Sequence, residues 1–302
     1  MKKLAITIGD PSGVGPEIIL KWARQNPQLA EKCEVIGNAQ LLDLLPSCIG
    51  KREISGEVFA FGQPCKKGAI LAHNALEEAA SGCKNGEYCA VVTAPVSKVE
   101  MVRAGYNFVG QTEFFESKWD GRAVMCFAGE KILLALATWH IPLSAVSKEL
   151  SFDKIERATN CLNEMCQALR EKQNPKIAVC GLNPHAGENG ILGREEIETI
   201  NPALNELRKK YPNISLALPP DTVFMRALKG EFDGIVSMYH DQGLAPLKAL
   251  EFDSAVNVSM GLEFVRTSPD HGTGFDIAGK NIASCKSFAA AVNVALKLVT
   301  KK

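Results

Sequence analysis

The chain has 302 residues, of which 46% are hydrophobic and 23% charged, as expected of a folded protein with a substantial core. Its 34 basic and 34 acidic residues cancel to a formal net charge of zero, and no block of Lys or Arg stands out. This composition argues against disorder and against nucleic-acid binding, which needs a basic face. It still allows a local basic pocket for a small anion.

Cysteine usage and the N-terminal residues favour a reducing compartment. The ten cysteines form no CxxC pair and no regular framework, which predicts reduced and mostly buried thiols. The opening Met1-Lys2-Lys3-Leu4 leads into a strand-like run without the apolar core of a signal peptide, and no apolar stretch is long enough to span a bilayer. We expect a cytoplasmic protein with no membrane partner and no nucleic-acid partner. The cysteines are Cys33, Cys48, Cys65, Cys83, Cys89, Cys126, Cys161, Cys166, Cys180 and Cys285.

Short apolar runs recur along the chain, and most are too continuously apolar to leave one face in solvent. They predict strands over Leu4–Ile8, Ala90–Thr93, Ile132–Thr138, Lys176–Cys180, Ile214–Leu218, Gly234–Met238 and Ala255–Ser259. Apolar residues at helical spacing predict helices over Ala69–Ala80, over Phe152–Lys172 behind a Ser151 cap, and over Ala289–Leu298. The alternation predicts the α/β class with largely parallel sheets.

A glycine-rich segment follows the first predicted strand and opens a helix. It reads Gly9-Asp10-Pro11-Ser12-Gly13-Val14-Gly15-Pro16-Glu17. Glycine allows unusual φ angles and close backbone approach, and Pro16 suits the first turn of a helix. The segment matches neither the dinucleotide fingerprint nor the phosphate loop that ends in GK[ST]. On pattern alone, a ligand-binding loop and a simple tight turn remain equally good interpretations.

Four of the five histidines stand in polar loops, whereas His73 lies on a predicted helix and is interpreted as a surface or packing residue. His140, His185 and His240 each follow a predicted strand, and His271 stands in a glycine-rich segment. The carboxyl ends of parallel strands form the ligand-binding edge of an open sheet, so histidines there favour a catalytic metal site. A single histidine of this kind is more often a hydrogen-bonded loop residue, and sequence spacing alone does not prove that several converge.

Two acidic residues and several polar ones stand near these loops. Asp241 is beside His240, and Asp221 stands in a Pro-Pro-Asp-Thr turn; either could orient a ligand or act as an acid or base. Further candidates suit a phosphorylated or carboxylated substrate. Each of them alone is equally well explained as a surface charge or a strand-end cap. These candidates are Gln111, Thr112, Lys248, Asn257 and Arg266.

Five segments closely resemble the 4-hydroxythreonine-4-phosphate dehydrogenase family of vitamin B6 biosynthesis, and the resemblance extends over essentially the whole chain. The first is the glycine-rich segment described above, and the other four contain the polar loop and the three strand-end histidines. These four are Gly110-Gln111-Thr112-Glu113-Phe114-Phe115, Ala137-Thr138-Trp139-His140-Ile141-Pro142-Leu143, Gly181-Leu182-Asn183-Pro184-His185-Ala186-Gly187-Glu188 and Met238-Tyr239-His240-Asp241-Gln242-Gly243-Leu244.

The resemblance implies a divalent metal, with zinc, cobalt or magnesium as candidates, held by His140, His185 and His240. It also implies a homodimer in which the histidines of one subunit complete the cleft of the other. The family's substrate-anchoring positions correspond to Thr112, Lys248, Asn257 and Arg266, with Gln111 beside them, and acidic positions near the metal correspond to Asp221 and Asp241. Asp241, Asp221 and Lys248 are therefore the expected catalytic residues.

A second resemblance concerns the segment 270–283, which looks like the adenosine-binding loop of the isopropylmalate and isocitrate dehydrogenases. It implies that NAD or NADP binds at His271, Gly272, Thr273, Asp276 and Asn281. The implied fold is two α/β/α domains with a central cleft. We expect residues 1–125 with 253–302 to form the first domain, which holds the cofactor loop, and residues 126–252 to form the second, which holds the metal histidines.

These resemblances imply oxidation of 4-phosphooxy-L-threonine to 2-amino-3-oxo-4-phosphooxybutanoate, which decarboxylates to 3-amino-2-oxopropyl phosphate. The chain departs from the family at two positions: Gln111 replaces the usual histidine, and Trp139 replaces a smaller polar residue. Glutamine donates and accepts hydrogen bonds but carries no charge. A sister dehydrogenase for a phosphorylated hydroxy acid such as phosphothreonate is therefore an alternative. A phosphate acyltransferase and a zinc hydrolase are alternatives from other classes.

Overall fold

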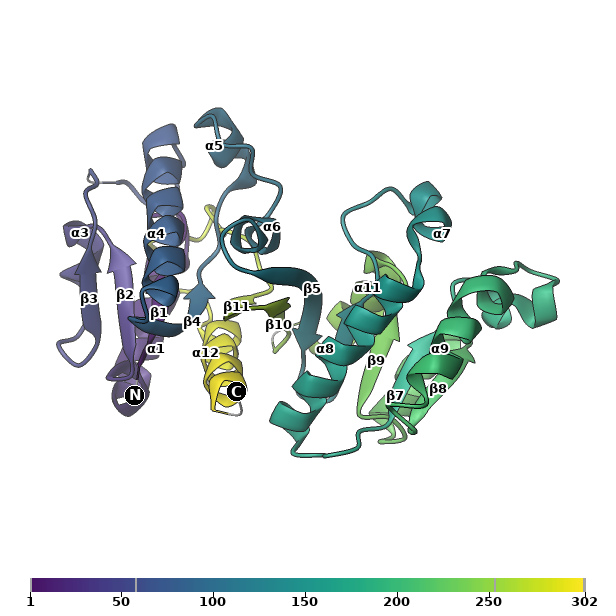
Figure 1. Cartoon of the computed structure of the whole chain (residues 1–302). Coiled ribbons are helices and arrows are strands. Elements are labelled where there is room, and N and C mark those ends of the chain that lie inside the picture. Colours follow the sequence, from purple (N-terminus) through teal and green to yellow (C-terminus); the bar gives the residue numbers. More distant parts are fainter. Residues whose placement is uncertain (1, 58, 253, 301–302) are drawn as a thin grey trace. The chain divides into compact units, whose positions relative to one another are not determined.

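Strands and helices alternate along the chain in the computed structural model, which describes residues 2–57, 59–252 and 254–300 (Figure 1). The predicted domain boundary at residue 253 and the extreme ends of the chain lie outside the described residues. Backbone contacts separate the chain into two compact units. The first unit takes the chain up to Ala123 together with Val256–Thr300, and the second takes Val124–Ala255.

The strands of the first unit follow the order β3-β2-β1-β4-β11-β10. The described pairs are parallel except that β10 is antiparallel to β11. The strands are β1 (Lys3–Thr7), β2 (Cys33–Gly37), β3 (Gly50–Glu53), β4 (Tyr88–Thr93), β10 (Val256–Leu262) and β11 (Val265–Pro269). The helices are α1 (Gly15–Gln25), α2 (Pro27–Ala30), α3 (Ala39–Leu42), α4 (Lys66–Lys84), α5 (Lys98–Arg103), α6 (Gln111–Glu116) and α12 (Lys286–Val299).

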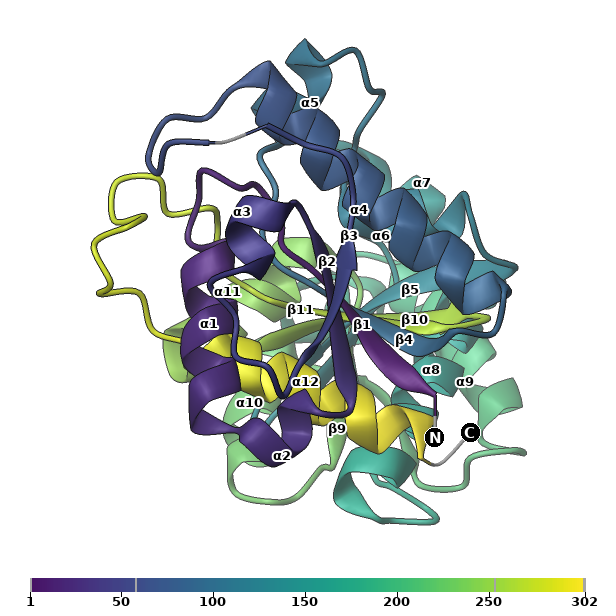
Figure 2. The ribbon, with the colours of Figure 1, turned by 90° about the vertical axis from the view of Figure 1, so that its left-hand side faces the viewer.

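Helices cover both faces of this sheet, as Figure 2 shows. α4 packs on β1, β2 and β4 from one side, while α12 packs on β4, β10 and β11 from the other, with α1 against α12. Successive strand residues point to opposite faces, and in β1 both Leu4 and Ala5 are fully buried, so both faces need a cover. Trp22 of α1 and Phe288 of α12 meet edge to face, with ring centroids 5.5 Å apart.

The second unit repeats the design with the strand order β5-β6-β9-β7-β8. β6, β9, β7 and β8 run parallel, and β5 is antiparallel to β6. α8 packs on β6 and β9, on the viewer's side of these strands in Figure 1. The strands are β5 (Gly121–Ala128), β6 (Leu133–Leu136), β7 (Ile177–Cys180), β8 (Ile214–Leu218) and β9 (Gly234–Ser237). The α-helices are α7 (Val146–Glu149), α8 (Phe152–Arg170), α9 (Asn201–Leu207), α10 (Pro220–Leu228) and α11 (His240–Glu251), with a π-helical turn at Glu196–Ile200.

All of the predicted strands and helices are present, with ends shifted by a few residues, and the largely parallel α/β class is confirmed. The predicted cap is also present, because the Ser151 hydroxyl accepts the Lys154 N–H at the start of α8. The prediction missed β2, β3, β5 and β11. β3 is a polar and mostly exposed edge strand, and β11 reads Val-Arg-Thr-Ser-Pro with three polar residues in the middle, so neither has an apolar pattern. No helix among the described residues is both long and apolar enough to cross a bilayer.

The strand order of the second unit brings the loops with histidines to one edge. β9 pairs with β6 on one side and with β7 on the other, all parallel. The carboxyl ends of parallel strands meet at the same edge. His140 follows β6, His240 follows β9 and His185 follows β7, so their loops leave the sheet side by side.

Candidate functional site

Two of the three predicted metal histidines face one cavity in the second unit. The ring centroids of His140 and His240 lie 5.8 Å apart, and the ring planes are tilted by 38°. With Trp139 and Tyr239 they line a cavity of about 400 Å³. Two imidazoles that bind one ion through ring nitrogens at about 2.0–2.1 Å have centroids roughly 5–6 Å apart, so the geometry of this pair suits a shared cation.

The backbone and an acidic neighbour hold the two imidazoles in place. His140 has a φ of 49°, in the left-handed region that a residue other than glycine rarely adopts. Such strain persists where the surrounding structure fixes the residue, and it is frequent at ligand sites. Nδ1 of His240 lies 2.6 Å from Oδ1 of Asp241. This contact leaves Nε2 of His240 as the nitrogen available to a ligand.

The other predicted catalytic residues of this unit lie on two helices. Asp221 is exposed in the first turn of α10. Lys248 is half-buried on α11, two turns after His240. The structure therefore places Asp241 in contact with a predicted ligand, whereas the acid and base roles of Asp221 and Lys248 stay predictions.

His185 lies in a left-handed turn after β7. Residues 185–189 all have positive φ, from 43° to 82°, and only one of them is a glycine. Each L-residue in this conformation costs about 1–2 kcal/mol, so neighbouring groups must hold the turn. Glu196, which is 1% exposed, accepts the N–H groups of Leu182 and Asn183 at 2.7 and 2.8 Å and thereby fixes the chain just before His185.

The structure does not assemble all three histidines within one chain. Across residues 2–57, 59–252 and 254–300, no three His, Cys, Asp or Glu side chains are grouped to hold one ion. His140 and His240 therefore fit a metal as a pair, and a complete site needs further ligands. The binding of a metal by His140, His185 and His240 stays a prediction.

In the first unit, the predicted anion-binding residues gather around Arg266. This side chain is 3% exposed, and its guanidinium donates to Thr93 Oγ1 at 2.7 and 3.0 Å and to Asn257 Oδ1 at 3.2 Å. Burial lowers the pKa of Arg266 to about 9, and the charge of Glu113 opposes this shift. Arg266 therefore remains a cation at neutral pH, in surroundings where a bound anion would be strongly favoured.

Gln111 and Thr112 reach the same neighbourhood from α6. The Thr112 hydroxyl lies 3.0 Å from the Ser259 hydroxyl. Ser259 of β10 pairs with Arg266 of β11. Gln111 Nε2 donates to the carbonyl oxygen of Ala94 at 3.4 Å, and its Oε1 is buried without a protein partner. The structure thus brings Gln111, Thr112, Asn257 and Arg266 together, while Lys248 belongs to the second unit.

The predicted cofactor loop packs on the glycine-rich turn. The Val14 N–H donates to the carbonyl oxygen of Thr273 at 2.9 Å, and a Cβ at Gly13 would lie 2.7 Å from the same oxygen. Glu17 accepts the N–H of Asn281, while Gly272 has open space around it and Asp276 is exposed. The glycine-rich turn therefore supports the loop that carries the predicted cofactor residues.

Buried polar atoms without protein partners cluster in these two segments. They are Oδ2 of Asp10, Oγ of Ser12 and Nε2 of His271. His271 Nδ1 lies 3.0 Å from the carbonyl oxygen of Gly272, so only one of its ring nitrogens has a protein contact. Because unsatisfied buried polar groups are costly, the segments suit a polar ligand such as a nicotinamide nucleotide.

The buried carboxyl group of Asp10 should make the free energy of unfolding depend on pH. Burial raises its pKa to about 6 from 3.8; the Ser12 N–H opposes this shift and Glu100 adds to it. A raised pKa means that the folded chain binds the proton more tightly, so this stabilising contribution is complete below pH 3.8 and is lost as the pH rises through about 6. Asp10→Asn should raise the free energy of unfolding at pH 7.5 by up to about 3 kcal/mol, and the gain should vanish near pH 4.

Urea unfolding of the wild type and of Asp10→Asn across this pH range measures the difference. Asp43→Asn, at an exposed position on the same unit, is the matched control. An equal gain for Asp10→Asn at both ends of the range would contradict the buried, protonated state of Asp10.

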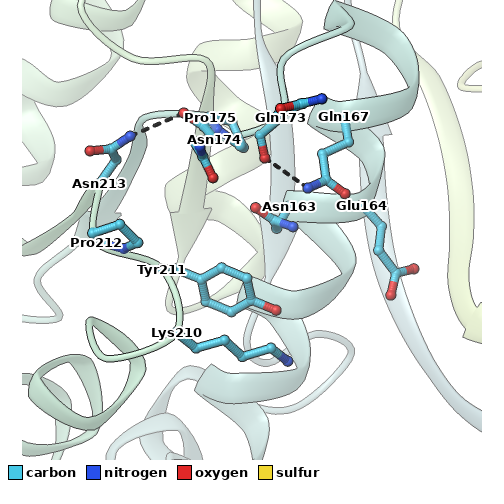
Figure 3. A pocket seen from close by; sticks show the side chains of 10 residues that line it. All are labelled: Asn163, Glu164, Gln167, Gln173, Asn174, Pro175, Lys210, Tyr211, Pro212 and Asn213. Carbon is cyan, nitrogen blue, oxygen red and sulfur yellow. Dashed lines mark hydrogen bonds between the residues drawn. The ribbon is translucent and has the colours of Figure 1, made fainter.

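A second cavity of the second unit lies away from the predicted site. It measures about 390 Å³, and its lining includes Asn163, Gln167 and Asn174 (Figure 3). Figure 3 shows Gln167 donating to the carbonyl oxygen of Gln173, and Asn213 donating to that of Asn174. This cavity lies where β7 and β8 begin, the end opposite to the histidine loops, and no predicted site residue lines it.

Comparison with known proteins decides the family. A family model described as pyridoxal phosphate biosynthetic protein PdxA matches residues 15–295. The chain belongs to the PdxA family. A curated relative named 4-hydroxythreonine-4-phosphate dehydrogenase, from Vibrio vulnificus (strain YJ016), is 39% identical and covers 100% of this chain and 99% of its own length.

Solved structures agree with this PdxA membership. A 4-hydroxythreonine-4-phosphate dehydrogenase from Klebsiella pneumoniae is 32% identical with a TM-score of 0.83, covering 99% of this chain and 100% of that one. An isocitrate dehydrogenase from Methylococcus capsulatus is 14% identical with a TM-score of 0.53, covering 100% of this chain and 86% of that one. The second match shows the fold alone and confirms the isocitrate dehydrogenase-like fold class. The PdxA-family chain is therefore an enzyme of the dehydrogenase type.

Several residues that shape the site were not singled out by sequence reasoning. Glu196 follows Arg194 and Glu195 and looks like one more surface charge, yet it is buried under the His185 loop. Thr138 and Gln242 stand beside the predicted ligands within the quoted motifs, but nothing in their type or spacing distinguishes a structural contact from a substrate contact. Thr93 ends an apolar strand, and only the pairing of β4 with β11 brings it to Arg266.

Proposed function

We propose that this PdxA-family chain oxidises the C3 hydroxyl of 4-hydroxythreonine 4-phosphate with NAD or NADP. The product, 2-amino-3-oxo-4-phosphooxybutanoate, loses CO2 and becomes 3-amino-2-oxopropyl phosphate. Family membership over nearly the whole chain supports the activity, as do the names of its relatives. The observation on which the substrate class depends is the buried Arg266, whose cationic group suits a phosphate or carboxylate.

The residues of the chain bind and orient the substrate. Arg266 binds an anionic end of the substrate, and Thr112 and Asn257 offer hydrogen bonds beside it. Lys248, on α11 of the second unit, is a further predicted anion-binding residue. Asp241 holds the His240 imidazole in one orientation, and either Asp241 or Asp221 takes up the proton that leaves the C3 hydroxyl. The loop that begins at His271 would hold NAD or NADP, which would supply the hydride acceptor for the oxidation at C3.

His140 and His240 would hold a divalent cation of zinc, cobalt or magnesium type, together with His185. When bound, such an ion supplies a Lewis acid for the hydroxyl oxygen and for the later carbonyl group. Because the described part of one chain pairs His140 with His240 but groups no third ligand with them, the proposal includes a homodimer in which a second copy completes the set. Exposed apolar side chains beside the predicted ligands support such an interface: Leu143 is 69% exposed and Ile191 is 79% exposed.

A cytoplasmic location is part of the proposal. The ten cysteines are free thiols, as expected in a reducing compartment.

A difference between this chain and the usual family pattern, at Gln111, favours a second candidate function. Gln111 stands where the family usually has histidine, and its buried Oε1 has no protein partner. A neutral amide at this position can bind a hydroxyl group as well as an amine. The second candidate is therefore oxidation of a phosphorylated four-carbon hydroxy acid without the amine, such as phosphothreonate.

A direct assay tests the proposal. The purified protein, supplied with each divalent metal and with NAD or NADP in turn, should form reduced nicotinamide and CO2 from 4-phosphooxy-L-threonine, and a chelator should stop both reactions. Faster turnover of phosphothreonate would favour the second candidate. His185→Ala should lose at least about 10²-fold in turnover, because a missing ligand weakens both the position and the charge of the ion. Wild-type turnover by this variant would remove His185 from the mechanism.

A further inference from the structure

We propose that Gln242 is a positioning residue that sets the spacing of the three histidine loops through one backbone hub at Met238. The inference rests on the proposed function, because it assumes that these histidines share a cation. It goes beyond that function by assigning a role to side chains that are not themselves predicted ligands.

The hub is a continuous run of hydrogen bonds. Thr138 donates to the carbonyl oxygen of Met238 twice, from its hydroxyl at 2.6 Å and from its backbone N–H at 3.1 Å. The Met238 N–H donates to Oε1 of Gln242 at 2.7 Å. Nε2 of Gln242 donates to the carbonyl oxygen of Gly181, also at 2.7 Å. The run therefore crosses from the end of β6 to the end of β9 and on to the end of β7.

Three of the four residues in the run stand a few residues before a predicted ligand. Thr138 and Met238 each come two residues before a histidine, His140 and His240 respectively, and Gly181 comes four residues before His185. A displacement of any one hub contact is therefore passed directly to the loop that follows. Sheet pairing between these strands ends near Leu136, Ser237 and Val179. Beyond those points the backbone bond from Thr138 to Met238 and the side chains of Thr138 and Gln242 connect the three loops.

The amide group of a glutamine performs both halves of the Gln242 contact. It accepts from one backbone N–H and donates to another backbone carbonyl, whereas a carboxylate accepts only and an apolar side chain does neither. Both bonds are short, and both partners are backbone groups that no change of side chain removes.

The hub is important because two of the histidines that it positions have a strained backbone. His140 and His185 both have positive φ, at 49° and 53°, and such conformations persist only where several contacts fix them. The His185 loop is held from one side by Glu196 and from the other by Gln242. Loss of the Gln242 contact should thus leave the fold intact while the loop relaxes away from the geometry that binds a metal.

Titration of the metal-free full-length protein with Co²⁺ tests the inference, read as the visible absorption band of the bound ion and as its Kd. Gln242→Met removes both bonds at similar volume and should weaken Co²⁺ binding by about 10- to 100-fold with a changed band, the usual range for groups that orient ligands. Gln167→Met is the matched control, because the same substitution also removes an amide-to-backbone bond, to the carbonyl oxygen of Gln173, at the strand ends opposite to the histidine loops. It should bind Co²⁺ like the wild type.

A second pair of variants keeps the test decisive if Gln242→Met fails to fold. Thr138→Val removes the hydroxyl donor to Met238 at nearly constant volume, and Thr138→Ser restores it. Valine should weaken Co²⁺ binding and serine should rescue it. Wild-type affinity and an unchanged band in both Gln242→Met and Thr138→Val would overturn the hub and leave the proposed function standing. If instead His140→Ala and His240→Ala bind Co²⁺ like the wild type, the metal site itself is wrong and the hub inference falls with it.

Discussion

His240→Ala is expected to lower kcat/KM by at least about 10³-fold and to remove high-affinity metal binding. The reason is that a catalytic cation contributes several kcal/mol of charge stabilisation, and about 4 kcal/mol corresponds to a thousand-fold in rate. The orientation of His240 is well defined, because Asp241 holds its Nδ1 and the His140 ring lies 5.8 Å away between ring centroids. Steady-state kinetics at saturating metal, together with the metal content of the purified variant, measure the effect.

His73→Gln is the matched control for this variant. His73 is a packing residue of the first unit, as predicted: its ring stacks on Tyr106 with centroids 3.7 Å apart. Its loss should leave both the metal content and kcat/KM close to wild-type values. Full metal content with unchanged turnover in His240→Ala would show that the His140–His240 pair is a structural contact and not part of a metal site.

Arg266→Met is expected to raise KM for the phosphorylated substrate by about 10²-fold or more, because a hydrogen bond to a charged group contributes about 1.5–3 kcal/mol and the guanidinium makes several at once. The Ki of inorganic phosphate as a competitor should rise in parallel. Unfolding in urea should also become easier, because removing the guanidinium leaves the Thr93 and Asn257 side chains without their charged donor. The parallel rise of KM and of the phosphate Ki is what separates anion binding from simple packing.

Arg226→Met serves as the control for Arg266→Met. Arg226 forms a surface ion pair with Glu231, and exposed pairs of this kind contribute about 0–1 kcal/mol. Its replacement should affect neither KM nor phosphate inhibition. If Arg266→Met keeps the wild-type KM but unfolds more readily, then the guanidinium serves only to tie Thr93 and Asn257 together.

Much of the fold was predictable because its physical cause is local. The strands Leu4–Ile8 and Gly234–Met238 are buried on both faces, so burial itself selects their continuous apolar runs. Ser151 caps α8 through an atom three residues away in sequence, and Pro16 starts α1 for an equally local reason. The prediction of strand-end histidines needed only the strands and the rule that loops with ligands leave their carboxyl ends.

The meeting of particular side chains depended on distant pairing. Arg266 looks like any exposed cation in sequence, and only the placement of β11 between β4 and β10 buries it against Thr93 and Asn257. Glu196 and Gln242 are ordinary polar residues until the order β6-β9-β7 brings three loops to one edge.

The sequence by itself determined the α/β class, the positions of most strands and the set of histidines and polar residues available for chemistry. Their causes, side-chain burial and local backbone preference, act over a few residues. Only the tertiary structure decided which polar groups are buried, which histidines face one cavity and which backbone atoms hold the loops. Those outcomes depend on strand order and register, which are set by contacts between residues a hundred or more positions apart, such as Thr138 with Met238 and Thr93 with Arg266.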